Sequence, residues 1–147
     1  MQNNSIKVLI ADDHPLIRLG YRKLLDGKSD IQIVGEASNG REAIELVEKC
    51  NPDVLILDLQ MPVMDGIQAL EHLKNLGSKV RVLIVSAFLD NQYTSEVLSR
   101  GAWGYYLKDE APNIIVDAVR QAARGDGQGT RPRPSLQLIK KLTSADL

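Results

Sequence analysis

Five short runs of Val, Ile and Leu recur along the chain, and each has the length of a β-strand. They lie at 7–12 (KVLIAD), 31–37 (IQIVGEA), 53–59 (DVLILDL), 80–87 (VRVLIVSA) and 103–107 (WGYYL). The first, third and fourth runs are almost continuously apolar, whereas a strand with one solvated face alternates apolar and polar residues. This pattern predicts strands that are buried on both faces, as in a parallel sheet.

Stretches of helical period separate these runs. They lie at 15–26, 40–50, 66–75, 91–100 and 112–124. In the second stretch, Ala43, Ile44 and Val47 form one apolar stripe, and the charged residues lie mostly outside it. Five alternations of strand and helix predict a doubly wound α/β domain with a five-stranded parallel sheet and right-handed crossovers.

Polar residues stand at the ends of four predicted strands. Asp12 and Asp13 end the first strand, Asp58 ends the third, Ser86 ends the fourth and Lys108 follows the fifth. In doubly wound sheets, functional groups lie beyond the carboxyl ends of the strands. We therefore expect these five side chains to gather at one edge of the sheet.

Three carboxylates at one edge repel one another, because each pair about 4 Å apart costs roughly 4 kcal/mol at an effective dielectric constant near 20. They require a cation. Oxygen ligands completed by water suit Mg²⁺, or Mn²⁺. A carboxylate beside such an ion can attack a phosphoryl group and form an aspartyl phosphate. Lys108 would supply a positive charge and Ser86 a hydroxyl donor, so the set predicts phosphoryl acceptance.

Simpler roles exist for the single residues. Asp12 and Asp13 ahead of Pro15 fit an ordinary helix start, and Asp58 taken alone fits a polar strand end. His14 adjoins the acidic pair, but a hard cation prefers oxygen, which indicates a loop or first-turn position for His14. The phosphoryl chemistry therefore depends on the whole set of residues.

Composition agrees with one soluble domain and a tail. The 147 residues suffice for one domain of ordinary size, and 44% apolar with 25% charged residues argue against general disorder and membrane spanning. A formal net charge of -1 gives no general attraction to nucleic acid or to an anionic membrane. The single cysteine, Cys50, and the polar start MQNNS, which lacks a signal-peptide pattern, predict a cytoplasmic protein.

The character of the chain changes after Arg124. Residues 125–134 (GDGQGTRPRP) are rich in Gly, Pro and Arg, which predicts a flexible linker. Its GxGxG pattern follows a helix, so it lacks the strand context of a dinucleotide-binding loop. Residues 135–147 place three apolar side chains at helical spacing, which predicts a short amphipathic tail helix or the start of a missing output domain.

With these motifs in view, the chain resembles the receiver domain of two-component response regulators, in particular the NarL/FixJ-type subgroup. The matching pieces, in order, are IADDHP (10–15), LDLQMPVMDG (57–66), VSA (85–87) and GAWGYYLKD (101–109). With the spacing between them they cover 6 to about 124. The resemblance implies a receiver domain over 1–124 with a flavodoxin-like (βα)5 fold and strand order 2-1-3-4-5.

The resemblance also assigns roles at the strand ends. It implies that Asp58 is the phosphoacceptor. It implies that Asp13 and Asp58 bind Mg²⁺ directly, that Asp12 acts largely through water, and that the backbone carbonyl of Gln60 completes the protein ligands. Such a domain catalyses only its own phosphorylation and dephosphorylation and is not a metabolic enzyme.

A switch follows from the same resemblance. Ser86 and Lys108 would contact the phosphoryl group, and Tyr105 would be the aromatic switch that follows Ser86 inward. Phosphorylation adds about -1.5 to -2 charges and three strong acceptor oxygens at one point, which gives both contacting residues new partners. Inward rotation of Tyr105 would change the face formed by the fourth helix, the fifth strand and the fifth helix.

An output patch is a further hypothesis. Trp103 shares strand parity with Tyr105, which predicts that both side chains lie toward the same side of the fifth strand. Trp103, with Phe88 and Leu89, would then enlarge an apolar patch for a partner or a second copy of the chain. The partners implied are a sensor histidine kinase and a homodimer, with DNA contacted only through an output domain and no membrane.

Two kinds of alternative stay open. Members of this subgroup are usually transcription factors with a carboxyl-terminal helix-turn-helix domain, for which 147 residues leave no room. LTSADL at 142–147 resembles the start of a LuxR-type DNA-binding domain, so the chain is either a receiver fragment or a stand-alone receiver acting through protein–protein interaction. The competing enzyme class is the haloacid-dehalogenase-like phosphatases, which require a second Asp where this chain has Gln60.

Overall fold

The computed structural model describes residues 4–87 and 91–131, and strands alternate with helices throughout these ranges. The strands are β1 (Ile6–Ala11), β2 (Ile31–Ala37), β3 (Val54–Asp58), β4 (Arg81–Ser86) and β5 (Gly104–Leu107). The helices are α1 (Pro15–Asp26), α2 (Gly40–Cys50), α3 (Gly66–Asn75), α4 (Asn91–Ser99) and α5 (Pro112–Arg124). Each predicted run and each predicted helical stretch therefore corresponds to one element.

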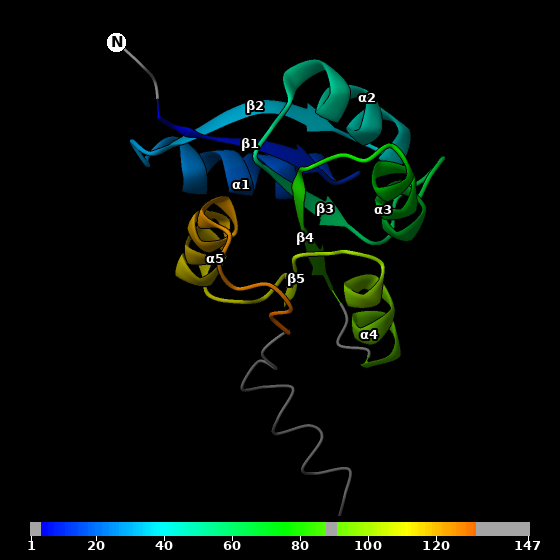
Figure 1. Ribbon diagram of the computed structural model, residues 1–147. Coiled ribbons are helices and arrows are strands. Elements are labelled where there is room, and N and C mark those ends of the chain that lie inside the picture. The colour runs from blue at the N-terminus through cyan, green and yellow to red at the C-terminus, as the bar shows by residue number, and fades with distance from the viewer. Residues whose placement is uncertain (1–3, 88–90, 132–147) are drawn as a thin grey trace, which may run out of the picture.

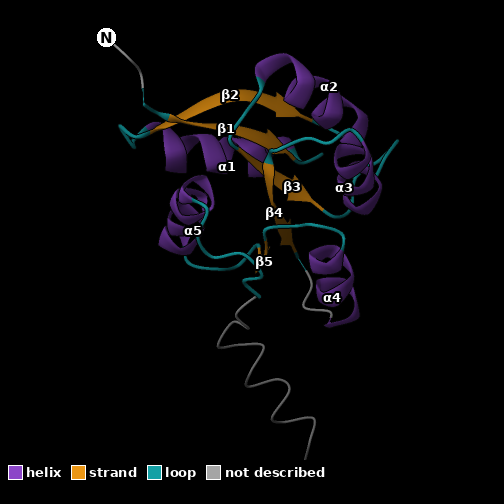
Figure 2. Cartoon of the chain, viewed as in Figure 1, coloured by secondary structure: helices purple, strands orange, loops and turns teal. Residues whose placement is uncertain are grey.

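The five strands form one parallel sheet in the order β2-β1-β3-β4-β5. β3 lies in the middle, and every one of its residues is buried. The continuous apolar runs arise because the sheet is covered on both faces (Figures 1 and 2). The predicted doubly wound, flavodoxin-like α/β fold with strand order 2-1-3-4-5 is confirmed.

Helices cover the sheet in two layers. The buried side chains of α2, α3 and α4 belong to one hydrophobic cluster, and those of α1 and α5 belong to a second cluster. In α2, Ala43 and Val47 are buried and Ile44 is partly buried, so the predicted apolar stripe is the face that meets the sheet. The two clusters lie on opposite faces of the sheet and together form the core.

Local signals in the sequence set the starts of the helices. Asn39 caps α2 by accepting a hydrogen bond from the backbone N–H of Glu42 at 2.9 Å. Asp65 and Gln68 form a capping box at α3, with bonds of 2.8 and 3.0 Å. The α3 cap matters for the site, because it ends the loop that leaves the carboxyl end of β3.

The chain after α5 is described as far as residue 131. Gly129 and Thr130 lie beside β5, because Gly129 donates to the Trp103 carbonyl just before this strand and Thr130 accepts from the Tyr105 N–H. The predicted tail helix at 135–147 lies outside the described residues, and the domain boundaries stay a prediction. In the part of the chain that the structure describes, no helix combines the length and the apolar character needed to cross a membrane.

Candidate functional site

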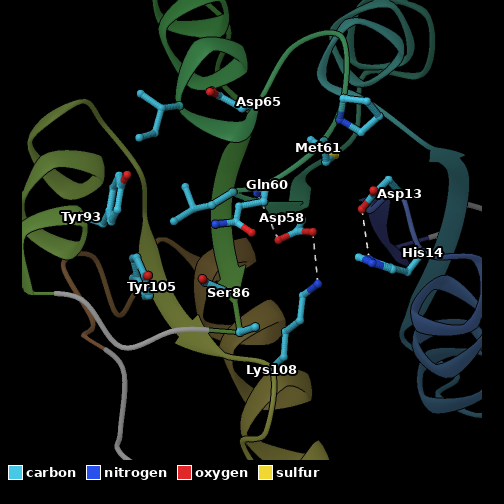
Figure 3. Close-up of a pocket in the computed structure, with 14 residues that line it drawn as sticks. Asp13, His14, Asp58, Gln60, Met61, Asp65, Ser86, Tyr93, Tyr105 and Lys108 are labelled. Carbon is cyan, nitrogen blue, oxygen red and sulfur yellow. Dashed lines mark hydrogen bonds and ion pairs between the residues drawn. The ribbon is translucent and has the colours of Figure 1, made fainter.

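The carboxyl ends of the strands bring the five predicted strand-end residues together. Figure 3 shows four of them, Asp13, Asp58, Ser86 and Lys108, around one site. Asp12 and Asp13 follow β1, Asp58 is the last residue of β3, Ser86 is the last residue of β4 and Lys108 follows β5. Three of the side chains are almost completely buried, because their exposed fractions are 2% for Asp12, 5% for Asp58 and 3% for Ser86. The site is therefore formed by buried side chains at the edge of the sheet.

Lys108 joins two of the strands through its ammonium group. Its Nζ lies 2.9 Å from Asp12 Oδ2 and 3.1 Å from Asp58 Oδ2. Its backbone N–H donates to the Ser86 carbonyl at 2.8 Å, which holds the lysine against the end of β4. Burial acts to lower the pKa of Lys108, but the hydrogen bonds and charges of the two carboxylates outweigh burial and raise this pKa. The ammonium is thus a permanent positive charge between Asp12 and Asp58.

Asp58 sits in an environment that disfavours its negative charge. Burial is the main effect that raises the pKa of Asp58; the Lys108 charge acts in the opposite direction, and the Asp12 charge adds to the increase. One weak hydrogen bond reaches Oδ1 from the backbone N–H of Gln60, at 3.4 Å. A carboxylate in this state gains stability from an added cation.

The acidic cluster has the geometry of a cation site. Ligand atoms of Asp12, Asp13, His14 and Asp58 all lie within 4.8 Å of one another. Asp13 Oδ1 is buried and makes no hydrogen bond, and the His14 Nδ1 that lies 3.0 Å from it carries a charge only when the imidazole is protonated. Carboxylate oxygens are the ligands that Mg²⁺ prefers. The donor set therefore fits a divalent cation of this kind.

His14 lies closer to this cluster than the sequence indicates. It is the N-cap residue of α1, in agreement with a loop or first-turn position. Its Nδ1 lies 3.0 Å from Asp12 Oδ1 and 3.0 Å from Asp13 Oδ1, while 63% of its side chain is exposed. The imidazole thus lies beside both carboxylates, a proximity that the prediction for His14 did not include.

A single cavity of about 1020 Å³ connects the acidic cluster to two aromatic rings. Asp13, Asp58 and Gln60 line one part of it, and Tyr93 and Tyr105 line the part beneath α4 (Figure 3). Tyr105 is fully buried, with 0% exposure, so its ring already lies inward. Tyr93 was not among the predicted site residues, because an aromatic residue in a helical stretch carries no sign of which cavity it will line.

Gly66 explains the tight loop after β3. Its N–H donates to the Leu59 carbonyl at 2.8 Å, and a side chain at this position would collide with the Asp58 carbonyl oxygen. The glycine thus lets α3 begin directly against the strand end. The close approach of the Asp58 carbonyl explains why a glycine follows Asp65 in the sequence.

Trp103 lies on the other side of the sheet from Tyr105. Trp103 packs with the α1 and α5 cluster, whereas Tyr105 belongs to the α2, α3 and α4 cluster. The prediction that both share one side is wrong, because β5 begins at Gly104 and regular strand alternation does not reach Trp103. Phe88 and Leu89 lie outside the described residues, so the apolar output patch stays a prediction.

Comparison with known proteins agrees with the resemblance. The family model of the response regulator receiver domain matches residues 8–120. The nitrate/nitrite response regulator protein NarL of Escherichia coli (strain K12) is 41% identical over 119 residues, which are 81% of this chain and 55% of NarL. The transcriptional regulatory protein DegU of Brevibacillus brevis is 36% identical over 141 residues, which are 96% of this chain and 59% of DegU.

A solved structure agrees as well. The signal receiver domain of NarL from Mycobacterium tuberculosis has a TM-score of 0.80 and 38% sequence identity, covering 83% of this chain and 98% of that domain. This chain therefore spans slightly more than half the length of the two regulators above but nearly the whole of the isolated domain.

Proposed function

The chain belongs to the response regulator receiver family of two-component systems, and from this premise we propose that Asp58 accepts a phosphoryl group from a sensor histidine kinase. The observation that supports this role is the burial of Asp58 at the end of β3, with Lys108 Nζ 3.1 Å from Oδ2 and two further carboxylates beside it. A buried carboxylate with a fixed cation at hand is a nucleophile placed for phosphoryl transfer.

The transfer exchanges one bond to phosphorus for another. A carboxylate oxygen of Asp58 attacks the phosphorus atom, the bond from phosphorus to the donor's imidazole nitrogen breaks, and that nitrogen leaves with the electron pair. Lys108 neutralises charge on the phosphoryl oxygens, and its position between Asp12 and Asp58 means that it needs little movement to do so. The Ser86 hydroxyl would donate to another phosphoryl oxygen.

A divalent cation, Mg²⁺ or Mn²⁺, is part of this proposal. Asp13 and Asp58 would bind it directly, Asp12 largely through water, and the Gln60 backbone carbonyl would complete the protein ligands. When bound, such an ion neutralises phosphoryl charge as a Lewis acid. The buried Asp13 Oδ1, which makes no hydrogen bond and lies in the acidic cluster, supports this ligand set.

Phosphorylation would be read out through Tyr105. Its ring lines the same cavity as Asp58 and Ser86, so a phosphoryl group there changes the surroundings of the ring directly. The Tyr105 ring is inward in this structure. We therefore propose that phosphorylation favours this inward state over others and so alters the face formed by α4, β5 and α5.

The output proposed for the whole protein is control of transcription. NarL and DegU are named as regulators, and this chain covers 55% and 59% of their lengths. By analogy, DNA would be bound by a region beyond those that match here, and a cytoplasmic homodimer would be the form that binds. This output is an inference from relatives and is separate from the chemistry at Asp58.

Mass spectrometry of the intact chain tests the chemistry. The chain is incubated with acetyl phosphate and Mg²⁺, and wild type is compared with Asp58→Asn and with a chelated sample. One phosphoryl group that requires both Asp58 and metal is the expected result. No adduct, under conditions that label another receiver domain, would overturn the proposed function.

A further inference from the structure

β5 is the last strand of the sheet, and an edge strand normally leaves a row of backbone groups unpaired. Residues 126–130, which we call the C-terminal strap, follow α5 and reach this edge at Gly129 and Thr130; Figure 1 shows the segment after α5 near β5. The Gly129 N–H donates to the Trp103 carbonyl at 2.8 Å, and the Tyr105 N–H donates to the Thr130 carbonyl at 2.9 Å. The strap therefore extends the hydrogen bonding of the sheet beyond β5.

Glycines allow the chain to take this path. Gly125, Gly127 and Gly129 have φ angles of 84°, 77° and 83°, values that other residues rarely adopt. Gly125 ends α5, and the next two turn the strap back toward β5. The GDGQG stretch, which did not fit a dinucleotide-binding loop, thus has a structural role in docking the strap.

Trp103 anchors the start of the strap. Its indole N–H donates to the Asp126 carbonyl at 2.6 Å. The guanidinium of Arg81 lies 5.0 Å from the centre of the indole ring, a cation–π distance, and its Nη1 donates to the Ala123 carbonyl in the last turn of α5 at 3.4 Å. Trp103 thus connects the strap to Arg81 at the start of β4, and Arg81 contacts the end of α5.

The other end of the strap contacts Tyr105, and this residue links the strap to the site. The backbone of Tyr105 is hydrogen-bonded to Thr130, while its buried ring lines the cavity that also holds Asp58 and Ser86. A docked strap thus restrains the backbone from which this ring projects. Loss of the strap would free the outer edge of β5 at Tyr105.

We propose that the C-terminal strap is a positioning element that holds the Tyr105 ring inward, so that strap docking and occupation of the phosphoryl site strengthen each other. This inference rests on the proposed function of Asp58. Because coupling between two binding events is reciprocal, a phosphoryl mimic should tighten the strap, and a weakened strap should lower the affinity for the mimic.

Gly129→Ala weakens the strap with little other change. A side chain there meets no atom within 4 Å, so its only cost is the φ angle of 83°. Gly77→Ala is the matched control, because Gly77 has a φ of 71° and equally open surroundings but lies after α3. Trp103→Phe is a second variant, which keeps an aromatic ring and removes the N–H that reaches Asp126.

Two measurements are made on the full chain with Mg²⁺: beryllofluoride affinity by calorimetry, and hydrogen exchange at the Tyr105 and Gly129 amides. We expect Gly129→Ala and Trp103→Phe to bind beryllofluoride about 2- to 10-fold more weakly than wild type and to exchange faster at both amides. Gly77→Ala should match wild type in both. Beryllofluoride should slow Gly129 exchange in wild type.

The outcomes separate this inference from the function on which it rests. If wild type does not bind beryllofluoride, the proposed phosphoryl site fails and the coupling fails with it. If wild type binds it but both strap variants bind it equally well, the coupling alone is overturned. Unchanged exchange at both amides in both variants would also overturn it, because these contacts would not hold the strap.

Discussion

The Lys108 ammonium lies 3.1 Å from the Asp58 carboxylate, although 50 residues separate the two along the chain. The contact exists because β3 and β5 end at the same edge of the sheet, with β4 between them. It couples the charge of the proposed nucleophile to a fixed cation. Stability, pH dependence and metal response should all depend on this pair.

Removal of the cation should destabilise the fold. Lys108→Met leaves Asp12 and Asp58 buried without their positive partner, so we expect the free energy of unfolding at pH 7 without metal to fall by about 2 kcal/mol. Urea unfolding measures this change. Lys79→Met, which removes an exposed lysine, is the control, and an equal loss in both variants would contradict the role of the pair.

The pH dependence follows from the raised pKa of Asp58. The folded state binds a proton on this group more tightly than the unfolded state, so its contribution favours folding at low pH and is lost as pH rises through the raised pKa. When a chelator has removed free metal, the free energy of unfolding should therefore decrease as the pH rises from the ordinary Asp pKa to the raised pKa of Asp58. Asp58→Asn should remove this component and raise Tm at pH 7.

Urea unfolding across this pH range, in wild type and in Asp58→Asn, tests the sign. Asp26→Asn is the control, because it replaces an exposed carboxylate at the end of α1, away from the site. A steeper negative slope in Asp58→Asn than in wild type would show that burial does not control this carboxyl.

Mg²⁺ should stabilise the domain through the acidic cluster. Binding to the folded state alone adds about 2.7 kcal/mol at 100 times the dissociation constant. Asp13→Asn should greatly reduce this increase, because it alters a carboxylate whose Oδ1 is buried without a hydrogen bond. Thermal unfolding with increasing Mg²⁺ is the measurement.

His14→Ala distinguishes oxygen ligands from the nearby imidazole. If the cation takes carboxylate oxygens, this variant should keep the Mg²⁺ response, although His14 Nδ1 lies 3.0 Å from both neighbouring carboxylates. Loss of the response in His14→Ala would mean that the imidazole is required for the site.

The loop after β3 should tolerate no side chain at Gly66. Gly66→Ala places a methyl group against the Asp58 carbonyl and the backbone of Leu59, and should cost about 1–3 kcal/mol. Gly20→Ala is the matched control, because this helical position is open and alanine favours helix there. A Tm for Gly66→Ala equal to that of Gly20→Ala would contradict the close packing of this loop.

The local sequence pattern was enough to predict the helices and strands and the edge of the sheet that carries the candidate site. Continuous apolar runs such as VLIL in β3 report burial on both faces, and helical stripes such as that of α2 report one buried side. Both signals depend on residues a few positions apart. Asp58 and Lys108 could be placed at one edge because parallel strands all present their carboxyl ends there.

Contacts between distant residues needed the folded chain. The side on which Trp103 packs, the place of Tyr93 in the cavity and the position of His14 beside two carboxylates have no signature in their own neighbourhoods. The local sequence predicted that the GDGQG stretch is a flexible linker, yet its glycines allow the strap to dock on β5. Periodicity in the sequence determines which elements form and which faces are buried, whereas the pairing of side chains and edges depends on how those elements pack in three dimensions.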